Sequence, residues 1–259
     1  MPRGINDFDA AALQGRNSET ASVLRTVSPG LITNGLVLYL DAGNYISYPA
    51  SGTTIVDMSG FGNNATLING PTYSRDNGGA IVFDGVNDYA NIATSNSIDS
   101  PLAGDFSYDI WLYPDTPAYS YPKIFSKGYY GSPQNSLQLG ANTTTTPKSI
   151  NVELMVSGVA VYPLSMGYTP LQWYNIVITR SIGDAMNLYS NSSLVASSGI
   201  ASISASFSNA YPLRLASRSG TPVSEYSLQR VGAFKMYNRA LTATEVEQNF
   251  NATRARFGL

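Results

Sequence analysis

Acid–base chemistry in this sequence depends on carboxylates, because its 259 residues include neither histidine nor cysteine. This composition excludes thiol nucleophiles, Ser-His-Asp triads and zinc sites. A glycosidase would still be possible in principle, since it needs two carboxyl groups facing each other across a groove. Asp105 and Asp109, in the segment DFSYD, would share one face of a strand but lie about 13 Å apart. That separation suits neither glycosidase mechanism, so we expect structural roles for both and predict a protein that is not an enzyme.

A second group of useful side chains is the tyrosine-rich segment PAYSYPKIFSKGYYGSPQNS. Tyrosine combines a flat apolar ring with a hydroxyl, so tyrosines in a polar loop can stack on sugar rings or anchor a protein partner. The alternative is that some of them belong to the core, because half of a strand's aromatic residues ordinarily face inward. The candidate ligand-binding residues are Tyr119, Tyr121, Tyr129 and Tyr130.

Short apolar runs separated by Gly, Pro, Asn or Ser are the elements that must position these side chains. GLVLYLDAG, from residue 35, predicts a strand buried on both faces. Further runs follow at fairly regular intervals, and no helical period interrupts them before residue 241. This spacing is typical of an antiparallel sandwich, in whose core we expect Trp111 and Trp173. The runs include ATLIN, AIVFDG, DYANIA, FSYDIWLYPD, PKIFSKG, SINVELMVSG, WYNIVITRS and YSLQRVGAFKMYN.

The segment IVFDGVNDYANI, residues 81–92, predicts a β-hairpin. IVF forms the first strand, Asp84 and Gly85 begin a tight turn in which glycine can take a positive φ, and DYANI returns as the second strand. We expect Asp84 and Asp88 to accept hydrogen bonds from backbone amides of the turn rather than to act as catalytic acids.

Residues 1–33 differ from the rest of the chain, being polar, mixed in charge and ended by Ser-Pro-Gly. They carry too little apolar surface to form a stable helix alone, so we interpret them as an arm that becomes ordered on another surface. The alternative is a simple disordered tail. The apolar residues available for anchoring the arm to a capsid are Phe8, Leu13, Val23 and Leu24.

Helical spacing appears at the C-terminus, in YNRALTATEVEQNFNATRARFGL. Thr242 and Glu245 fit a capping box, while Leu241 and Phe250 fall near one face. Gly258 stands where the helix should end. We expect a short helix that closes the sandwich.

Low charge restricts the partners. Charged residues make up 12% of the chain, and the net charge of −2 comes without a basic cluster. Nucleic acids and anionic membranes both demand clustered Lys or Arg, so we predict neither as a partner. The N-terminus lacks the apolar core of a signal peptide, and no apolar run approaches the roughly 20 residues that cross a bilayer. We therefore expect neither Sec export nor membrane insertion.

A family resemblance is carried, in this order, by GLVLYLDAGN, SGTTIVDMSGFGNNATLINGPTY, GGAIVFDGVNDYANI, FSYDIWLYPD, QWYNIVITRS and YNRALTATEVEQNFNATRARFGL. Together they resemble the laminin-G-like, concanavalin A-like jelly-roll domains, most closely those of virion structural proteins of tailed phages. The resemblance covers about residues 35–259. It implies an all-β domain over residues 34–259, a two-sheet antiparallel jelly-roll sandwich with a short C-terminal helix, preceded by the N-terminal arm.

The resemblance also implies a calcium site, since related domains often hold Ca²⁺ near the loop DMSGFGNN. The candidate ligands are Asp57, Asn63 and Asn64. With nearby carbonyls and water they could supply the 6 to 8 oxygens that Ca²⁺ takes, at weak affinity. The alternative is that Asn and Gly serve turn conformations alone, with no cofactor required. Many relatives have an acidic pair where this chain has Gly232 and Ala233, so a site drawing on that acid would lack it here.

The same resemblance weakens a hydrolytic interpretation. The glucanase branch of the superfamily carries a Glu-x-Asp-x-x-Glu strand, and no such arrangement occurs here. The glutamates of the chain are Glu19, Glu153, Glu225, Glu245 and Glu247.

We interpret the protein as a non-enzymatic phage virion component, made in the host cytoplasm and displayed on the particle surface. As a capsid decoration protein or head fibre, it would attach through its arm to capsid or other virion proteins and would form a homo-oligomer. The alternative is a carbohydrate-binding adhesion module of a tail or fibre that recognises host or environmental glycans. A glycan hydrolase is the third hypothesis, and it lacks suitable carboxylates.

Overall fold

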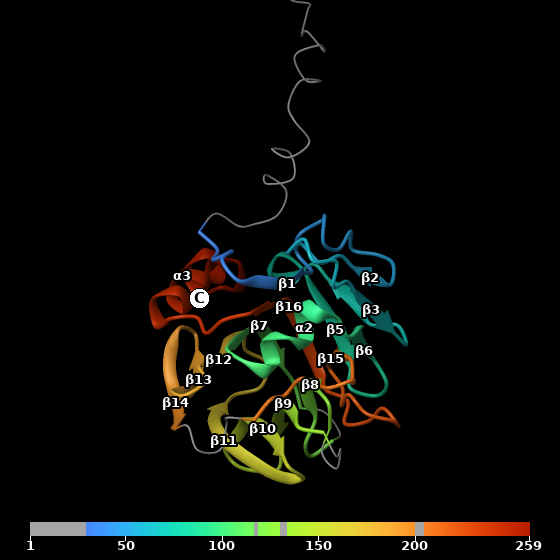
Figure 1. Ribbon diagram of the computed structural model, residues 1–259. Coiled ribbons are helices and arrows are strands. Elements are labelled where there is room, and N and C mark those ends of the chain that lie inside the picture. Colours follow the sequence, from blue (N-terminus) through green and yellow to red (C-terminus); the bar gives the residue numbers. More distant parts are fainter. Residues whose placement is uncertain (1–29, 117–118, 130–133, 200–204) are drawn as a thin grey trace, which may run out of the picture.

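The computed structural model describes residues 30–116, 119–129, 134–199 and 205–259. These residues form two antiparallel sheets of eight strands each, stacked as a sandwich, with one longer helix near the C-terminus (Figure 1). The predicted all-β, two-sheet jelly-roll fold with a short C-terminal helix is thereby confirmed. The helical elements are α2 (Asn96–Asp99), α3 (Ala243–Thr253) and the 3-10 turns η2 (Asp76–Gly78), η3 (Pro101–Ala103) and η5 (Arg254–Phe257).

Sheet A is built around its long last strand, β16, which pairs with β7 on one side and with β1 and β5 on the other. Its strands in spatial order are β14 (Ser193–Gly199), β13 (Ala185–Ser190), β12 (Tyr174–Arg180), β7 (Phe106–Pro114), β16 (Leu228–Tyr237), β5 (Ala80–Asp84) and β4 (Thr72–Ser74), with β1 (Leu36–Asp41) beside β16.

Sheet B faces sheet A across the main core. Its strands in spatial order are β11 (Val159–Tyr168), β10 (Lys148–Val156), β9 (Ser136–Asn142), β8 (Lys123–Lys127), β15 (Leu213–Leu215), β6 (Tyr89–Ile92), β3 (Ala65–Ile68) and β2 (Thr54–Ile55). Tyr108 of sheet A and Phe125 of sheet B meet with 4.8 Å between ring centroids, and Phe234 packs against both. Apolar side chains at alternate strand positions thus fill the space between the layers.

Helix α3 covers the outer face of sheet A and creates a second core. Trp111 stacks on Phe257 with 4.0 Å between ring centroids and donates its indole N–H to Thr253 Oγ1 at 2.9 Å. Trp173 packs on the same phenylalanine at 4.6 Å. Both tryptophans are buried as predicted, but beneath the helix rather than between the sheets. Gly232 stands beside them because a Cβ there would clash with the Phe257 ring.

The segment predicted as a hairpin instead joins the two sheets. β5 pairs with β4 and β16, whereas β6 pairs with β3 and β15, so the prediction was wrong. The turn itself forms as expected, since the Asp84 carboxylate accepts hydrogen bonds from the amides of Val86, Asn87 and Asp88, and Gly85 has φ 72°. A local turn signal fixes the bend, but strand partners are chosen by packing across the whole domain.

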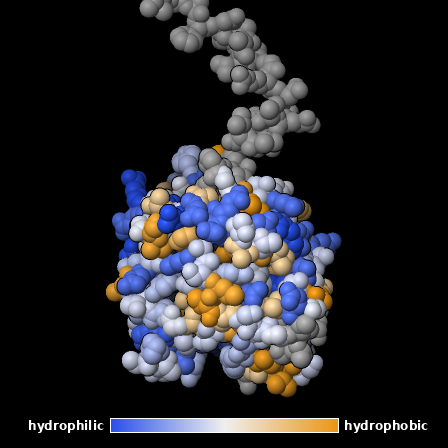
Figure 2. Space-filling model, turned by 90° about the vertical axis from the view of Figure 1, so that its left-hand side faces the viewer, coloured by the Kyte–Doolittle hydropathy of each residue, from blue (hydrophilic) through white to orange (hydrophobic). Residues whose placement is uncertain are grey.

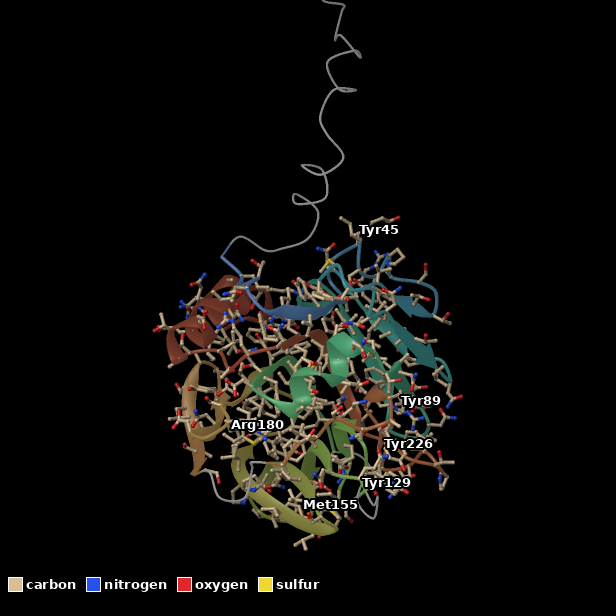
Figure 3. All side chains as sticks on the ribbon, viewed as in Figure 1. Tyr45, Tyr89, Tyr129, Met155, Arg180 and Tyr226 are labelled. Atoms are coloured by element: carbon tan, nitrogen blue, oxygen red, sulfur yellow. The ribbon has the colours of Figure 1, made fainter. Side chains whose placement is uncertain are left out.

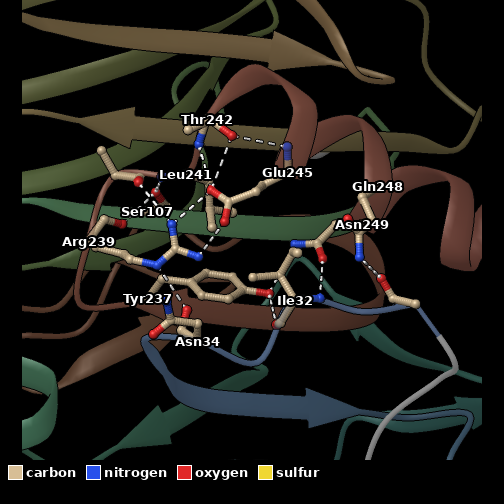
Figure 4. A network of polar contacts seen from close by, with 12 residues as sticks. Ile32, Asn34, Ser107, Tyr237, Arg239, Leu241, Thr242, Glu245, Gln248 and Asn249 are labelled. Atoms are coloured by element: carbon tan, nitrogen blue, oxygen red, sulfur yellow. Dashed lines mark hydrogen bonds and ion pairs between the residues drawn. The ribbon is translucent and has the colours of Figure 1, made fainter.

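The described start of the chain is held against α3, as Figure 4 shows. Gln248 donates its amide to the Gly30 carbonyl at 2.7 Å, and Ile32 N donates to Asn249 Oδ1 at 2.9 Å. The Tyr237 hydroxyl donates to the Ile32 carbonyl at 3.1 Å. Gly30 therefore lies beside α3, at the end of the molecule opposite to β10 and β11 (Figure 1).

The same network starts helix α3. Thr242 and Glu245 form the predicted capping box. Arg239 donates two hydrogen bonds of 2.8 and 2.7 Å to the Glu245 carboxylate (Figure 4). These bonds from Arg239 are the main reason that the pKa of Glu245 falls to about 2. Arg239 also donates to the Asn34 carbonyl at 3.0 Å, which ties β1, β16 and α3 together.

Exposed apolar side chains stand in separate patches among polar ones on the face shown in Figure 2. Leu194 and Val195 of β14 are among the exposed apolar residues of the chain. No helix within the described residues has the length and apolar character needed to span a membrane.

Candidate binding groove

The outer face of sheet B is covered in part by the loop 216–227, which joins β15 to β16 and which we call the covering loop. Ser126 of β8 holds it down, because its hydroxyl donates to the Ser217 carbonyl at 2.9 Å and accepts from Ser219 N at 2.6 Å. On the β9–β11 side of this loop the surface is hollowed into a groove, and on the β6 side lie tyrosines.

The groove has a volume of about 540 Å³, which suits one or two sugar rings or a similar small ligand. Its walls combine two tyrosines with amide, hydroxyl and charged side chains. The lining residues are Tyr121, Lys123, Asn142, Ser149, Asn151, Glu153, Tyr162, Arg218 and Glu225.

The alternation of β10 supplies the polar floor. Ile150 and Val152 are fully buried in the main core, so Ser149, Asn151 and Glu153 project to the other face of the strand. Asn151 accepts a hydrogen bond from Ser165 Oγ on β11 at 2.7 Å, which fixes the amide in the floor.

A missing side chain makes room for the central carboxylate. Gly140 of β9 lies opposite Asn151 in the ladder, and a Cβ at this position would clash with Glu153 Oε1. The glycine therefore leaves the space that the Glu153 carboxyl group occupies.

A charged cluster occupies the middle of the groove. Lys123 Nζ lies 2.9 Å from Glu153 Oε2 and 3.1 Å from Glu225 Oε2, and it also donates to the Tyr121 carbonyl at 3.3 Å. Because both carboxylates contact one nitrogen, these two oxygens lie at most about 6 Å apart. Arg218 adds a second cation, 3.3 Å from Glu225 Oε1.

Glu225 is held in an unusual backbone conformation. Its φ of 56° lies in the left-handed region, which is unfavourable for a residue with a side chain. The Glu225 carbonyl accepts a hydrogen bond from Lys123 N at 2.9 Å, so the backbone and side chains of these two residues hold each other. Backbone strain of this kind collects at functional sites.

The pKa of the Glu153 carboxyl is raised above its ordinary value, because burial disfavours the charged form. Lys123 acts in the opposite direction, and Glu225 adds a smaller upward contribution. Glu153 therefore takes up a proton at a higher pH than a free glutamate.

The predicted ligand-binding tyrosines separate in the structure. Tyr121 lines the groove and is 55% exposed. Tyr119 packs on Tyr226 of the covering loop, which in turn packs on Tyr89 of β6. Tyr129 packs edge-on against Tyr211. Tyr89, Tyr226 and Tyr129 follow one another along the side of the molecule in Figure 3. Tyr130 and the arm residues Phe8, Leu13, Val23 and Leu24 lie outside the described residues.

The three predicted calcium ligands bind protein groups instead of converging on a cation. The Asp57 carboxylate accepts four hydrogen bonds, from Tyr39 N, Ser59 N, Ser59 Oγ and Asn63 N. Asn64 Oδ1 accepts from Asp57 N, and Asn63 Oδ1 accepts from serine hydroxyls near α2. The residues as arranged do not fit a calcium ion, and among the described residues no group of three or more acidic side chains suits a metal.

Asp105 and Asp109 have structural partners. Asp105 accepts a hydrogen bond from Ile182 N at 2.7 Å. Asp109 forms a fully buried ion pair of 2.8 Å with Lys235 beneath α3, and it accepts further hydrogen bonds from Asn175 and Asn249.

Sequence reasoning missed most of the groove. It named Tyr121 but not Tyr162, and it did not place Glu153 and Glu225 together. The polar positions 149, 151 and 153 alternate with apolar ones in SINVELMV, a pattern that signals an exposed polar strand face. No comparable signal links that strand to the covering loop.

One comparison shows the family of the protein. The family model described as the concanavalin A-like lectin/glucanases superfamily matches residues 84–247. The chain therefore belongs to this family, in agreement with the resemblance of its motifs. A search of curated protein sequences gave no significant match.

Solved structures with the same fold include receptor-binding domains of botulinum neurotoxins. The C/D mosaic domain has a TM-score of 0.67 at 14% identity, and the serotype D domain has 0.66 at 14%; in both cases 85% of this chain and 52% of that chain are covered. Botulinum neurotoxin type C, which depends on interaction with two ganglioside molecules to enter cells, has 0.67 at 11%, covering 86% and 52%. This chain thus spans about half the length of these relatives, and at such identities the likeness concerns the fold.

Proposed function

We propose that this protein is a non-catalytic carbohydrate-binding module whose ligand lies in the groove on sheet B. The observation that carries the proposal is the combination of exposed tyrosine rings, Tyr121 and Tyr162, with hydrogen-bonding side chains in one hollow of about 540 Å³. Sugars need both, because their ring faces stack on aromatics while their hydroxyls require donors and acceptors. The description of the matching family as concanavalin A-like lectins and glucanases is consistent with this function.

The carboxylates of Glu153 and Glu225 lie close enough together that a glycosidase function has to be considered. A retaining glycosidase uses two carboxyl groups about 5–5.5 Å apart, one as nucleophile and one as acid. Here Lys123 contacts both carboxylates and Arg218 contacts Glu225 as well. A carboxylate held by two cations is a poor nucleophile, so binding is the better-supported function.

The test is a glycan array, followed by calorimetry with the sugars that bind. Tyr121→Ala should weaken binding by about tenfold, equivalent to 1.4 kcal/mol. Tyr45→Ala is the matched control, because Tyr45 is 79% exposed and lies at the opposite end of the molecule (Figure 3). Binding to no sugar, or equal loss in both variants, would contradict the proposal, and release of reducing ends would establish a hydrolase instead.

The particle-surface role is a second proposal, in which residues 1–33 attach the module to capsid or other virion proteins, as a homo-oligomer. The motif resemblance supports it, and so does the position of Gly30 beside α3, far from β10 and β11 (Figure 1). An arm entering there would leave the groove facing outward. Deleting residues 1–29 should remove the protein from particles while leaving sugar binding unchanged, and retention of the truncated protein on particles would refute the attachment.

A further inference from the structure

The charged side chains of the groove lie at different depths below the surface. The Lys123 side chain is only 4% exposed, compared with 14% for Glu153 and 27% for Glu225. A molecule that enters from solvent therefore meets carboxylate oxygens before it reaches the ammonium group. The surface offered to a ligand is rich in hydrogen-bond acceptors.

The ammonium group has no donor left for a ligand. Its three hydrogens match three acceptors, which are Glu153 Oε2, Glu225 Oε2 and the Tyr121 carbonyl. Arg218 places Nη1 3.3 Å from Glu225 Oε1 and its guanidinium 5.2 Å from the centre of the Tyr129 ring, and its buried Nε has no hydrogen-bond partner among the described residues. Two cations and two carboxylates compensate each other, so the cluster holds no spare positive charge.

From this arrangement we infer that the groove selects uncharged sugars and rejects anionic ones, an inference that rests on the proposed sugar-binding function. Hydroxyl groups of a neutral sugar can donate charge-assisted hydrogen bonds to the accessible part of these carboxylates. The carboxylate or sulfate of an anionic sugar would instead lie against Glu153 and Glu225. Like charges placed together in an interface disfavour binding strongly.

The experiment compares sugars that differ only in charge, such as a sialylated glycan with its desialylated form and a uronic-acid oligomer with its hexose counterpart. We expect the neutral member of each pair to bind at least about tenfold more tightly, or 1.4 kcal/mol. Adding salt should narrow the difference, because it screens the repulsion. This salt series needs no variant and so does not depend on the folding of a mutant.

Glu225→Gln tests the assignment to residues. This change removes one negative charge and frees donors of Lys123 and Arg218, so the preference for the neutral sugar should shrink by about tenfold. Glu247→Gln, on the exposed surface of α3, is the control and should keep the wild-type preference.

The outcomes separate the two proposals. Equal or tighter binding of the anionic sugars by the wild-type protein would overturn the charge selectivity while leaving sugar binding intact. A preference that does not respond to salt or to Glu225→Gln would also overturn it. Failure to bind any member of either pair, or any sugar on the array, would instead count against the proposed function itself.

Discussion

The outer faces of the two sheets each carry a lysine paired with carboxylate, in opposite surroundings. On sheet A, Lys235 and Asp109 are fully buried beneath helix α3, and the aspartate also accepts amide hydrogen bonds from Asn175 and Asn249. On sheet B, Lys123 is nearly buried, but its partners Glu153 and Glu225 reach into an open groove. A lysine–carboxylate pair is therefore shielded from ligands on sheet A and accessible to them on sheet B.

The two sites differ because different elements cover the outer faces of the two sheets. Helix α3 brings an amide and an apolar face over sheet A, so every polar atom of the Asp109–Lys235 pair finds a protein partner and no ligand can reach it. The covering loop reaches only part of sheet B and contributes Arg218 and Glu225 to the rim of a hollow. A buried pair of the first kind serves the fold, and a half-open cluster of the second kind is suited to binding.

The largest effect should come from breaking the closed pair. Lys235→Met leaves Asp109 as an uncompensated charge in the second core, which should lower the free energy of unfolding by about 3–5 kcal/mol. Denaturant titration measures the loss. Asp76→Asn, which breaks an exposed ion pair with Arg230, is the control and should cost less than about 1 kcal/mol. Similar losses for the two variants would show that burial does not distinguish them.

The corresponding change in the open cluster should affect stability less. In Lys123→Met the two glutamates lose their shared partner, but water and Arg218 can reach them, so we expect a loss of about 1–3 kcal/mol. Sugar binding should fall as well, because the carboxylates are no longer fixed. A stability loss as large as that of Lys235→Met would contradict the contrast between the two faces.

The shape of the groove can be changed without altering its charge. Gly140→Ala adds a methyl group where Glu153 Oε1 lies, so the carboxyl group must move and sugar affinity should fall by about tenfold. Gly167→Ala on β11 is the matched control, because its added Cβ would meet nothing closer than 3.9 Å. Equal sugar affinities of the two variants in calorimetry would show that Glu153 does not contribute to the binding site.

Acidification should change the free energy of unfolding in opposite directions at Glu245 and at Glu153. The pKa of Glu245 is about 2 in the folded protein, below its ordinary 4.5, so the Arg239–Glu245 contact adds stability above pH 4.5 and loses it progressively toward pH 2. Unfolding free energies of the wild type and Glu245→Gln should therefore converge over this range. A difference that is constant with pH would rule out the ionised contact.

Glu153 should respond in the opposite direction, since its pKa is raised in the folded protein. The folded state then binds the proton more tightly than the unfolded state, so acidification stabilises the wild type relative to Glu153→Gln, and raising the pH removes the gain. The same titration series measures it. A relative loss on acidification would show that Lys123 outweighs burial at this site.

Prediction from the sequence succeeded where the determinants are local. Alternating apolar residues indicated the strands, and Thr242 with Glu245 indicated the start of α3, because capping depends on residues three positions apart. The turn at Asp84 was also correct. What failed was the pairing of the strands around it, since pairing partners come from distant segments.

The candidate site was predicted only in part for the same reason. Tyr121 was found because tyrosines cluster in one segment, but those tyrosines divide between both sides of the covering loop. Asp57 and Asn63 had the composition of a cation loop, yet their oxygens are occupied by backbone amides and serine hydroxyls. Residue type did not reveal which partner each oxygen would take.

The sequence by itself determined a weakly charged, histidine-free β-sandwich with one C-terminal helix, because periodicity, turn residues and caps act over a few positions. Only the tertiary structure decided that Glu153 and Glu225 share one lysine, that a glycine leaves space for a carboxylate, and that one outer face is closed while the other is open. These features depend on contacts between segments far apart in the chain, which are set by how the sheets, the loop and the helix pack together.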